Sequence, residues 1–442
     1  MIYTFGQDKA SLNGVGFDQL VRYAEDMILN FEIYVPHSDL ENPAMPRDPL
    51  PSQPVQPAAR LYYLDWLRVI AILGVFLFHA VHPFDLTAWH IKNAEQSLAI
   101  TVFIAFMFPW GMPFFFLLAG AGSWFALRRR SAQEFARERF NRLLLPFIGG
   151  AILLMPVMLY FEWSHKTQTG LFHMSYWEFL LDRNVGFTPA WFGALGYHLW
   201  FLGFLFSFSL LALPICYWLK GSAGQAWVAR LANFCQHRGG ILIFILPLTL
   251  IRIALHPFFP QEHSWADFFV QMAFYLSGFI LFSNQGFLRA IKRDWWIALV
   301  LGIAAAAAGM GMALSSGTLD LQTAPRTLRD FLFWGLVSID SWCWTIFFVY
   351  IGMRFLDYSN RWLAYGQEAI LPFFVFHQPV IIILAFYAVQ WQASLPVKLL
   401  FVVLGSFVVS LGIYELAVRR ILTLRLVFGM KTNRLVSKGE AS

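Results

Sequence analysis

Residues 62–79 decide the fold class, and they read Tyr62-Tyr-Leu-Asp-Trp-Leu-Arg-Val-Ile-Ala-Ile-Leu-Gly-Val-Phe-Leu-Phe-His79. The run is almost entirely apolar and approaches the roughly 20 residues that a helix needs to cross a bilayer. It nevertheless contains Asp65, Arg68 and His79. Charged side chains inside the hydrocarbon region are costly, so they usually serve a function. The run therefore predicts a transmembrane helix with a functional polar face.

Arg68 and His79 are expected on the same side of this helix. At about 100° per residue, their separation leaves only about 20° around the helix axis and about 16 Å along it. Asp65 precedes Arg68 by one turn, a spacing that favours an ion pair and lowers the cost of placing Arg68 near lipid. The sequence thus predicts a charge pair near one end of the face and a histidine near the other.

The composition indicates an integral membrane protein in contact with membrane lipid. Of the 442 residues 58% are hydrophobic and only 13% are charged, whereas soluble proteins average about 25% charged residues. The net charge of +6 follows from the basic inner loops of membrane proteins, so no nucleic acid partner is predicted. Cys216, Cys235 and Cys343 are too scattered to predict a disulfide framework or a metal site.

The predicted fold is an all-α, polytopic membrane helical bundle of about ten transmembrane helices. The segment 98–127 is too long for one straight span and contains Pro109 and Pro113, which predict either one kinked helix or two helices. The apolar segments lie near 62–82, 98–127, 143–162, 197–219, 240–257, 266–284, 295–315, 331–353, 368–390 and 396–418.

Three parts of the chain are predicted. Residues 1–60 form an N-terminal cytoplasmic extension, and seven prolines between 36 and 57 make its second half a linker. Residues 61–430 form the membrane domain, and residues 431–442 form a cytoplasmic tail. With the N-terminus inside, the inner loops and tail hold twenty lysines and arginines and the outer loops six. This bias predicts a multi-pass protein of the plasma (inner) membrane with both termini in the cytoplasm.

Five sequence blocks follow one another along the chain: Arg68 with His79, Pro113-Phe-Phe-Phe-Leu-Leu-Ala-Gly120, Phe135-Ala-Arg-Glu-Arg-Phe-Asn-Arg-Leu-Leu-Leu-Pro146, His198-Leu-Trp-Phe-Leu202 and Phe376-His-Gln-Pro379. In this order they resemble the acyltransferase-3 superfamily of membrane acyltransferases, over about residues 61 to 430. Ala119 stands where that superfamily commonly has Ser. Three blocks are most like its glucan-succinylating branch: Trp89-His-Ile-Lys-Asn-Ala-Glu-Gln-Ser-Leu98, the block at 198–202 and Ile413-Tyr-Glu-Leu416.

The resemblance implies an O-acyltransferase that moves an acetyl or succinyl group to a hydroxyl of a glycan or other extracytoplasmic acceptor. Its implied co-substrate is acyl-CoA (acetyl-CoA or succinyl-CoA), supplied from the cytoplasm, with no permanently bound cofactor. The sequence also suits a transporter or flippase that forms no covalent bond, and it leaves a regulatory role and the oligomeric state open. It contains no P-loop, HExxH or GxSxG motif, which argues against ATP-driven transport and zinc or serine hydrolases.

Two residues are predicted to be catalytic. His79 has an ordinary pKa near neutrality and can take a proton from a hydroxyl as a general base, or it can simply bond a neighbouring helix. Arg68 presents a planar fork of donors that suits a phosphate, a carboxylate or an oxyanion, or it serves only the ion pair with Asp65.

Five residues are predicted to bind substrate: Asp65, Arg142, His198, Trp200 and His377. Arg142 ends the arginine-rich stretch 128–142, which we call the basic run. This run either binds the phosphates of coenzyme A or is basic only because inner loops of membrane proteins usually are. His198 begins the fourth span and His377 lies within the ninth, so each either orients the acceptor or bonds a helix. Trp200 either stacks on a sugar ring or anchors the membrane interface. Weaker candidates for acceptor binding or stacking are His90, Glu95, Glu162, Trp191 and Trp265.

Overall fold

A computed structural model describes residues 60–166, 174–182, 197–315 and 327–430. Within these ranges every regular element is helical, so the predicted all-α class is confirmed. The predictions for the N-terminal extension and for the tail at 431–442 lie outside the described residues, apart from Arg60.

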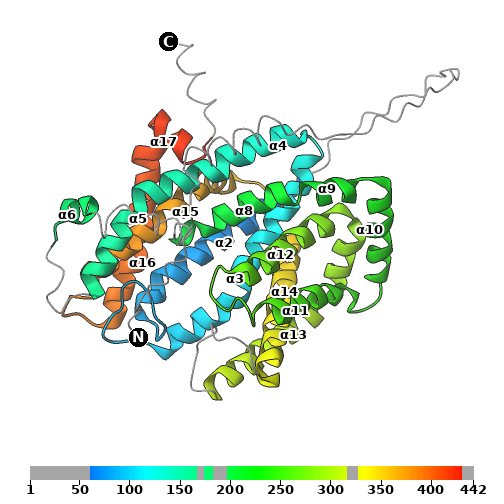
Figure 1. Ribbon diagram of the computed structural model, residues 1–442, viewed down its shortest axis with the longest axis horizontal. Helices are drawn as coiled ribbons and strands as arrows, with labels where there is room; N and C mark the ends of the chain where they lie inside the picture. The colour runs from blue at the N-terminus through cyan, green and yellow to red at the C-terminus, as the bar shows by residue number, and fades with distance from the viewer. Residues whose placement is uncertain (1–59, 167–173, 183–196, 316–326, 431–442) are drawn as a thin grey trace, which may run out of the picture. The chain divides into compact units, whose positions relative to one another are not determined.

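The helices follow one another along the chain as Figure 1 shows. They are α2 Tyr62–Val81, η1 His82–Phe84, α3 Leu98–Leu127, α4 Ala132–Arg139, η2 Phe140–Leu144, α5 Leu145–Lys166, α6 Tyr176–Leu181, η3 Tyr197–Leu199, α8 Trp200–Leu211, α9 Leu213–Lys220, α10 Ser222–Phe234, η4 Gly240–Phe244, α11 Ile245–Leu255, α12 Trp265–Ser283, α13 Gln285–Ser315, α14 Leu328–Phe355, α15 Arg361–Ala388, α16 Leu395–Ile413, η5 Tyr414–Val418 and α17 Leu422–Val427.

In the described part of the chain, eight helices are long and apolar enough to cross a membrane, or nine if one bent pair forms a single span. The bent pair is Tyr197–Leu211 with Leu213–Lys220, which meet at 49° where Pro214 opens α9. The predicted span at 240–257 is the short apolar helix Gly240–Leu255, only about 24 Å long at 1.5 Å per residue. The predicted multi-pass helical bundle is therefore confirmed, and in the described residues eight or nine helices have the length and composition of spans, against ten apolar segments counted in the sequence.

Helix α3 is one continuous helix, although Pro109 and Pro113 lie inside it. Pro113 has no N–H to offer the carbonyl of Pro109 four residues earlier. The hydroxyl of Ser341 on α14 lies 2.6 Å from that carbonyl oxygen and also 2.6 Å from the carbonyl oxygen of Val337 in its own helix, so the two carbonyls share its one proton. A neighbouring helix thus supplies part of the hydrogen bonding that the proline removes, as membrane helices require.

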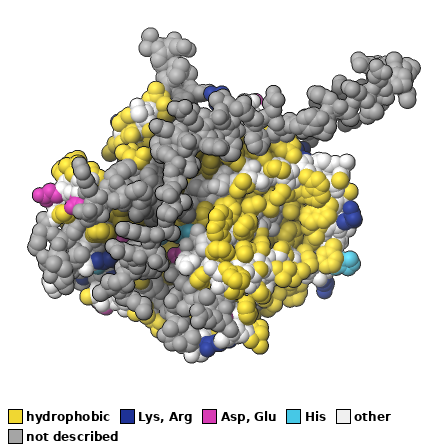
Figure 2. Space-filling model, viewed as in Figure 1, with side chains coloured by type: hydrophobic (Ala, Val, Ile, Leu, Met, Phe, Trp, Pro, Cys, Tyr) yellow, Lys and Arg dark blue, Asp and Glu magenta, His cyan; other side chains and the backbone are white. Residues whose placement is uncertain are grey.

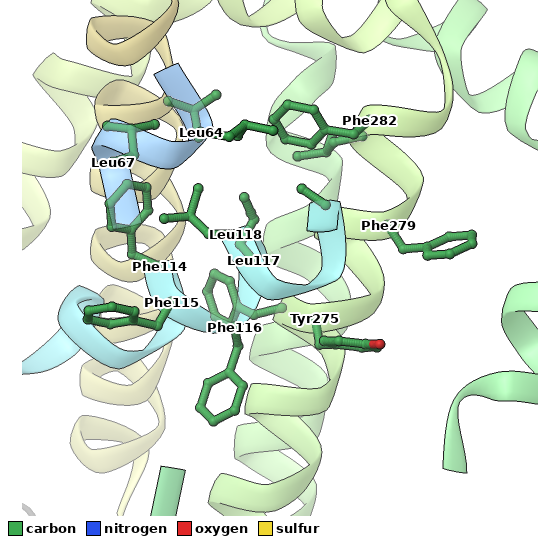
Figure 3. Close-up of a cluster of buried hydrophobic side chains, with 14 of the residues drawn as sticks. Leu64, Leu67, Phe114, Phe115, Phe116, Leu117, Leu118, Tyr275, Phe279 and Phe282 are labelled. Atoms are coloured by element: carbon green, nitrogen blue, oxygen red, sulfur yellow. The ribbon is translucent and has the colours of Figure 1, made fainter. Parts of the chain in front are cut away.

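The centre of the bundle is packed around α2, which contacts α3, α14, α15 and α16. Figure 3 shows Leu64 and Leu67 of α2 facing the apolar side chains of α3 and α12. A Cβ atom at Gly120 would collide with the carbonyl oxygen of Tyr275, and one at Gly278 with that of Leu117. The two glycines therefore bring the backbones of α3 and α12 into direct contact.

The surface of the bundle carries many large apolar side chains. Figure 2 shows a broad hydrophobic area over the region where α11 and α12 lie in Figure 1, with charged side chains at its edge. Leu246 and Leu250 on α11 and Phe269 on α12 are among the exposed apolar side chains of these two helices. An apolar surface of this extent is what a lipid-facing wall requires.

The chain reverses between two ends of the bundle. At one end α2 and α15 finish and α3, α8 and α16 begin, and we call this the His79 end. At the other end α2 and α15 begin and α3 finishes, and we call this the Arg68 end.

Candidate active site

Three histidines from three separate segments meet at the His79 end. His79 Nδ1 of α2 lies 3.0 Å from His377 Nε2 of α15. The ring of His198, from η3, meets the His377 ring edge-on with 5.3 Å between centroids. His377 and His198 are buried, while His79 is half-buried. The structure thus brings together three residues that the sequence singled out one by one.

Pro379 explains why His198 joins this group. The proline cannot donate to the carbonyl of Val375 four residues earlier, and His198 Nε2 lies 3.0 Å from that oxygen. Because a carbonyl only accepts, the proton is on Nε2. The second nitrogen, His198 Nδ1, is buried without a partner. Of the two predicted roles for His198, bonding a neighbouring helix is the one that its described contacts serve.

The hydrogen bonds fix which nitrogen of His79 is free. His377 Nδ1 lies 2.5 Å from the carbonyl oxygen of Phe374, so this nitrogen carries the proton and Nε2 is an acceptor. His79 Nδ1 must then donate to His377 Nε2. The lone pair of His79 therefore sits on Nε2, which has no hydrogen-bond partner among the described residues.

A second polar group, the weaker candidates His90 and Glu162, lies beside the histidines. His90 Nδ1 is 2.6 Å from Glu162 Oε2, and the hydroxyl of Tyr197 donates to the same oxygen at 3.2 Å. Lys166 also pairs with Glu162. Gln378 Nε2 lies 3.2 Å from His90 Nε2, and since Gln378 follows His377 in α15, it joins the two groups.

The backbone is strained at Tyr197, which contacts both Glu162 and His90. Its φ of 54° lies in the left-handed region that residues with a Cβ rarely adopt. The ring lies 4.9 Å from that of His90, and the next residue is His198. The strained turn thus turns Tyr197 toward His90 and His198 toward α15.

The loop between α2 and α3 is held by a buried ion pair. Lys92 Nζ lies 2.5 Å from Asp85 Oδ1 and donates to the carbonyl of His82 at 2.7 Å. His82 Nδ1 lies 2.9 Å from Asp85 Oδ2. Burial alone would raise the pKa of Asp85, but the contacts with His82 and Lys92 outweigh it and hold that pKa below its usual value. The pair fixes the loop that carries His90 beside the histidines.

Sequence reasoning did not single out Asp85, Lys92, Tyr197 or Gln378. One local signal was available, because His79, His82 and Asp85 continue one helical face at intervals of three residues. Lys92 entered only as a loop charge. Among the described residues, no three or more His, Cys, Asp or Glu side chains are grouped so that they could hold a metal ion.

At the Arg68 end the predicted ion pair is present. Arg68 Nη1 lies 3.0 Å from Asp65 Oδ1, and Nη2 donates to the carbonyl of Leu118 at 3.1 Å. A Cβ at Gly122 would lie 2.8 Å from Nη2. The small residue on α3 therefore makes room for the guanidinium, and part of its fork of donors is already in use.

Arg139 enters the bundle and Arg142 does not. Arg142 lies on the π-helical turn η2, pairs with Glu138 at 3.6 Å and keeps 45% of its side chain exposed. Arg139 donates to the hydroxyl of Ser123 on α3 at 3.3 Å. The arginine of the basic run that approaches the Arg68 end most deeply is thus one that the sequence did not single out.

The aromatic candidates do not converge on the histidines. Trp200 packs against His263, with 4.3 Å between ring centroids. Trp265 and Glu95 are exposed, and Trp191 lies outside the described residues. Of the predicted binding residues, His198 and His377 lie with His79. Asp65 and Arg142 lie at the Arg68 end, where Arg142 is close enough to act electrostatically on Arg68, and Trp200 lies apart.

Comparison with known proteins gives two findings. A family profile described as an acyltransferase domain, that of the acyltransferase-3 family, matches residues 61–415. Curated relatives named glucans biosynthesis protein C, from Salmonella paratyphi A and from Salmonella agona (strain SL483), are 22% identical over 371 residues. Each alignment covers 82% of this chain and 93% of the relative. No solved structure matches the chain.

Proposed function

The chain belongs to the acyltransferase-3 family of membrane acyltransferases, and from this premise we propose that His79 is the base that transfers an acetyl or succinyl group to a hydroxyl. The observation that carries the proposal is the hydrogen-bond chain from Phe374 O through His377 to His79. It leaves the lone pair on His79 Nε2, at the half-buried member of the cluster. A neutral imidazole held in one tautomer is suited to general base catalysis.

The proposed step is a single displacement at the acyl carbonyl. The acceptor oxygen attacks the carbonyl carbon while His79 Nε2 takes the hydroxyl proton. The new ester bond forms as the bond to the donor's leaving group breaks, and the leaving group takes the proton from His79. His377 accepts a hydrogen bond from His79 Nδ1 throughout, so it stabilises the positive charge that the imidazole gains during the step.

The proposed acceptor is a glycan. The relatives are named for glucan biosynthesis, and that name supports a carbohydrate hydroxyl here. We place the His79 end on the outer side of the plasma membrane and both termini in the cytoplasm, because the inner loops and tail predicted from the sequence hold twenty lysines and arginines and the predicted outer loops six.

The donor is a separate part of the proposal. Acetyl-CoA or succinyl-CoA stays the predicted co-substrate, and Arg68 and Arg139 are the cations nearest the Arg68 end that could bind its phosphates. Arg68 is about 16 Å from His79 along α2, so it acts on a remote part of the donor and not on the reacting carbonyl. A lipid-linked or other activated acyl group is the competing donor.

The test uses purified protein in lipid nanodiscs with a linear glucan as acceptor. Labelled acetyl-CoA and succinyl-CoA are supplied separately, and mass spectrometry detects acyl groups on the glucan. Wild-type protein should acylate the glucan, and the His79→Ala protein should not. His237→Ala is the matched control, because His237 is exposed and lies outside the cluster.

The outcomes separate the parts of the proposal. If the glucan is acylated when membrane extract is added but not with acetyl-CoA or succinyl-CoA, the donor is a different molecule, and His79 remains the proposed base. Transfer at the wild-type rate by His79→Ala contradicts the proposed base. Movement of labelled acyl groups or glycan across vesicles without a new ester bond indicates a carrier instead.

A further inference from the structure

Arg252 is a buried arginine that has no hydrogen bond to any described residue. It lies in the last turn of α11 and is 6% exposed. Its Nε is buried and unpaired, and among the described residues no acceptor is bonded to any of its nitrogens. A guanidinium removed from water in this way is costly unless an acceptor meets it.

No carboxylate of the described residues forms an ion pair with Arg252. Asp267, at the start of α12, is the acid that acts on it electrostatically, but the two are not within ion-pair distance. Asp267 Oδ2 instead accepts a hydrogen bond from the backbone N–H of His263 at 2.8 Å. The guanidinium therefore lacks a partner in the part of the chain that the structure describes.

His256 repeats this pattern one turn further along. It is 3% exposed, and neither Nδ1 nor Nε2 has a partner. Its ring is stacked on that of Trp334 of α14, with 3.8 Å between centroids and 10° between planes. The guanidinium of Arg252 lies 5.5 Å from the centre of the same indole. One aromatic surface therefore holds both unpaired groups.

This arrangement differs from the histidine cluster, where each of the three rings has at least one nitrogen bonded within the protein. At α11 a charged fork and a neutral ring lie against one indole, and their nitrogens form no hydrogen bond with the described residues. Trp334 fixes both, because cation–π contact and stacking limit the positions that each can take. A preorganised group of unpaired donors is a feature of binding sites for anions.

We propose that Arg252 and His256, held on Trp334, bind an anionic group, a carboxylate or a phosphate, between α11 and α14. Arg252 gives the anion two charge-assisted hydrogen bonds, and His256 donates a third. The group comes either from a soluble molecule or from a lipid headgroup, since α11 also faces lipid through Leu246 and Leu250. The site is independent of the proposed acyl transfer at His79.

The experiment has a soluble arm and a lipid arm. In the first, the thermal unfolding midpoint of the detergent-purified full chain is measured against sodium phosphate and sodium succinate, with sodium chloride at equal ionic strength. In the second, native mass spectrometry counts phosphatidylglycerol and phosphatidylcholine molecules retained by the protein. Both arms use wild type, Arg252→Met, His256→Phe and the exposed control Arg230→Met.

The proposal expects saturable stabilisation of the wild type by phosphate or succinate, or specific retention of phosphatidylglycerol. The first result identifies a soluble anion, and the second identifies a lipid headgroup. Arg252→Met should raise the apparent Kd by about tenfold or more, since it removes two charge-assisted bonds. His256→Phe keeps the stack on Trp334 and removes one donor, so a severalfold rise is expected. Arg230→Met should bind as wild type does.

Two results would overturn the proposal. One is a wild-type protein that responds in neither arm, or that responds equally after Arg252→Met. The other is a His256→Phe protein that binds phosphate, succinate and phosphatidylglycerol as tightly as wild type does, because His256 would then donate nothing to the anion. If Arg252→Met does not fold, His256→Phe alone decides, since it keeps the ring packing.

Discussion

The two ends of α2 organise their polar residues differently. At the His79 end, side chains of α2, α15, η3 and α5 bond one another over long distances in the sequence. At the Arg68 end, Arg68 is paired with an acid one turn away and with one carbonyl of the neighbouring α3. The first arrangement fixes proton positions, and the second neutralises a charge. On the proposed function, we expect substitutions at the His79 end to change the reaction and those at the Arg68 end to change donor binding and stability.

The largest effect is expected for His79→Ala. Removing a general base costs about 10²- to 10⁴-fold in rate, and the half-buried position lets the chain fold without it. The acylation assay in nanodiscs measures kcat, and circular dichroism confirms the helical content. A fall in rate matched by His237→Ala would mean that the histidine cluster has no special part.

Asp85→Asn comes next and tests the loop at the same end. It leaves Lys92 buried beside a neutral side chain, so we expect a loss of about 3 kcal/mol in the free energy of unfolding near pH 7. The pKa of Asp85 is lowered in the folded state, chiefly because the contacts with His82 and Lys92 outweigh the opposing effect of burial. Its stabilisation is therefore complete above the ordinary aspartate pKa of about 3.9 and is lost as the pH falls through the folded pKa.

Thermal unfolding of wild type and Asp85→Asn as a function of pH makes the measurement. The difference between the two should be constant from neutral pH to about pH 5 and should shrink below about pH 4. Glu95→Gln is the control, because Glu95 is exposed in the same loop. A difference that persists unchanged into acid would contradict the ion pair as its source.

His377→Phe separates positioning from packing. Phenylalanine fills the site beside Phe373 and Phe76 but cannot accept the hydrogen bond from His79 Nδ1. We expect kcat to fall by about tenfold to a hundredfold, the cost of one buried hydrogen bond, with KM unchanged. His377→Gln retains an acceptor and should recover part of the rate. Equal activity of the two variants would argue that His377 only fills space.

Arg68→Lys probes the other end. The charge is kept, but lysine cannot serve both Asp65 and the carbonyl of Leu118 with the geometry of a planar fork. We expect a loss of about 1 kcal/mol in stability and a rise in KM for the donor with kcat nearly unchanged. A fall in kcat as large as that of His79→Ala would mean that Arg68 acts at the reacting carbonyl, and the two ends would then share one function.

The smallest effect is expected for Ser341→Ala. The carbonyl of Pro109 loses its donor from α14, which costs about 1 kcal/mol or less when water or the helix compensates. Chemical unfolding in mixed micelles measures the change, with Ser283→Ala, whose hydroxyl bonds its own helix, as the control. If Ser341→Ala and Ser283→Ala lower the free energy of unfolding equally, Ser341 has no interhelical role.

Local sequence patterns predicted much of the fold. The apolar runs marked the long helices, and a spacing of three residues predicted the pair of Asp65 with Arg68, because both depend only on the helical repeat. The number of spans was harder to predict from the sequence. Pro214 bends one apolar segment, and the segment after Gly240 stops short of a bilayer's thickness, although both read as spans by composition.

The candidate site was predictable in its members but not in its contacts. His79 and His377 are 298 positions apart, and no periodicity links residues on different helices. The basic run illustrates a second obstacle. Arg142 lies in the π-helical turn η2, which departs from the regular α-helical repeat, so helical spacing could not predict that Arg139 would be more buried than Arg142.

Pro379 and His198 have an evolutionary consequence. If another residue replaced Pro379, its own amide would compete for the carbonyl of Val375, and His198 would lose its acceptor. Loss of His198 would in turn leave the carbonyl of Val375 without a hydrogen-bond donor. Among relatives of this chain the two positions should therefore covary, with a donor at one wherever proline stands at the other. The same rule applies to Pro113 and Ser341, so paired substitutions in homologous sequences could be read as records of interhelical contacts.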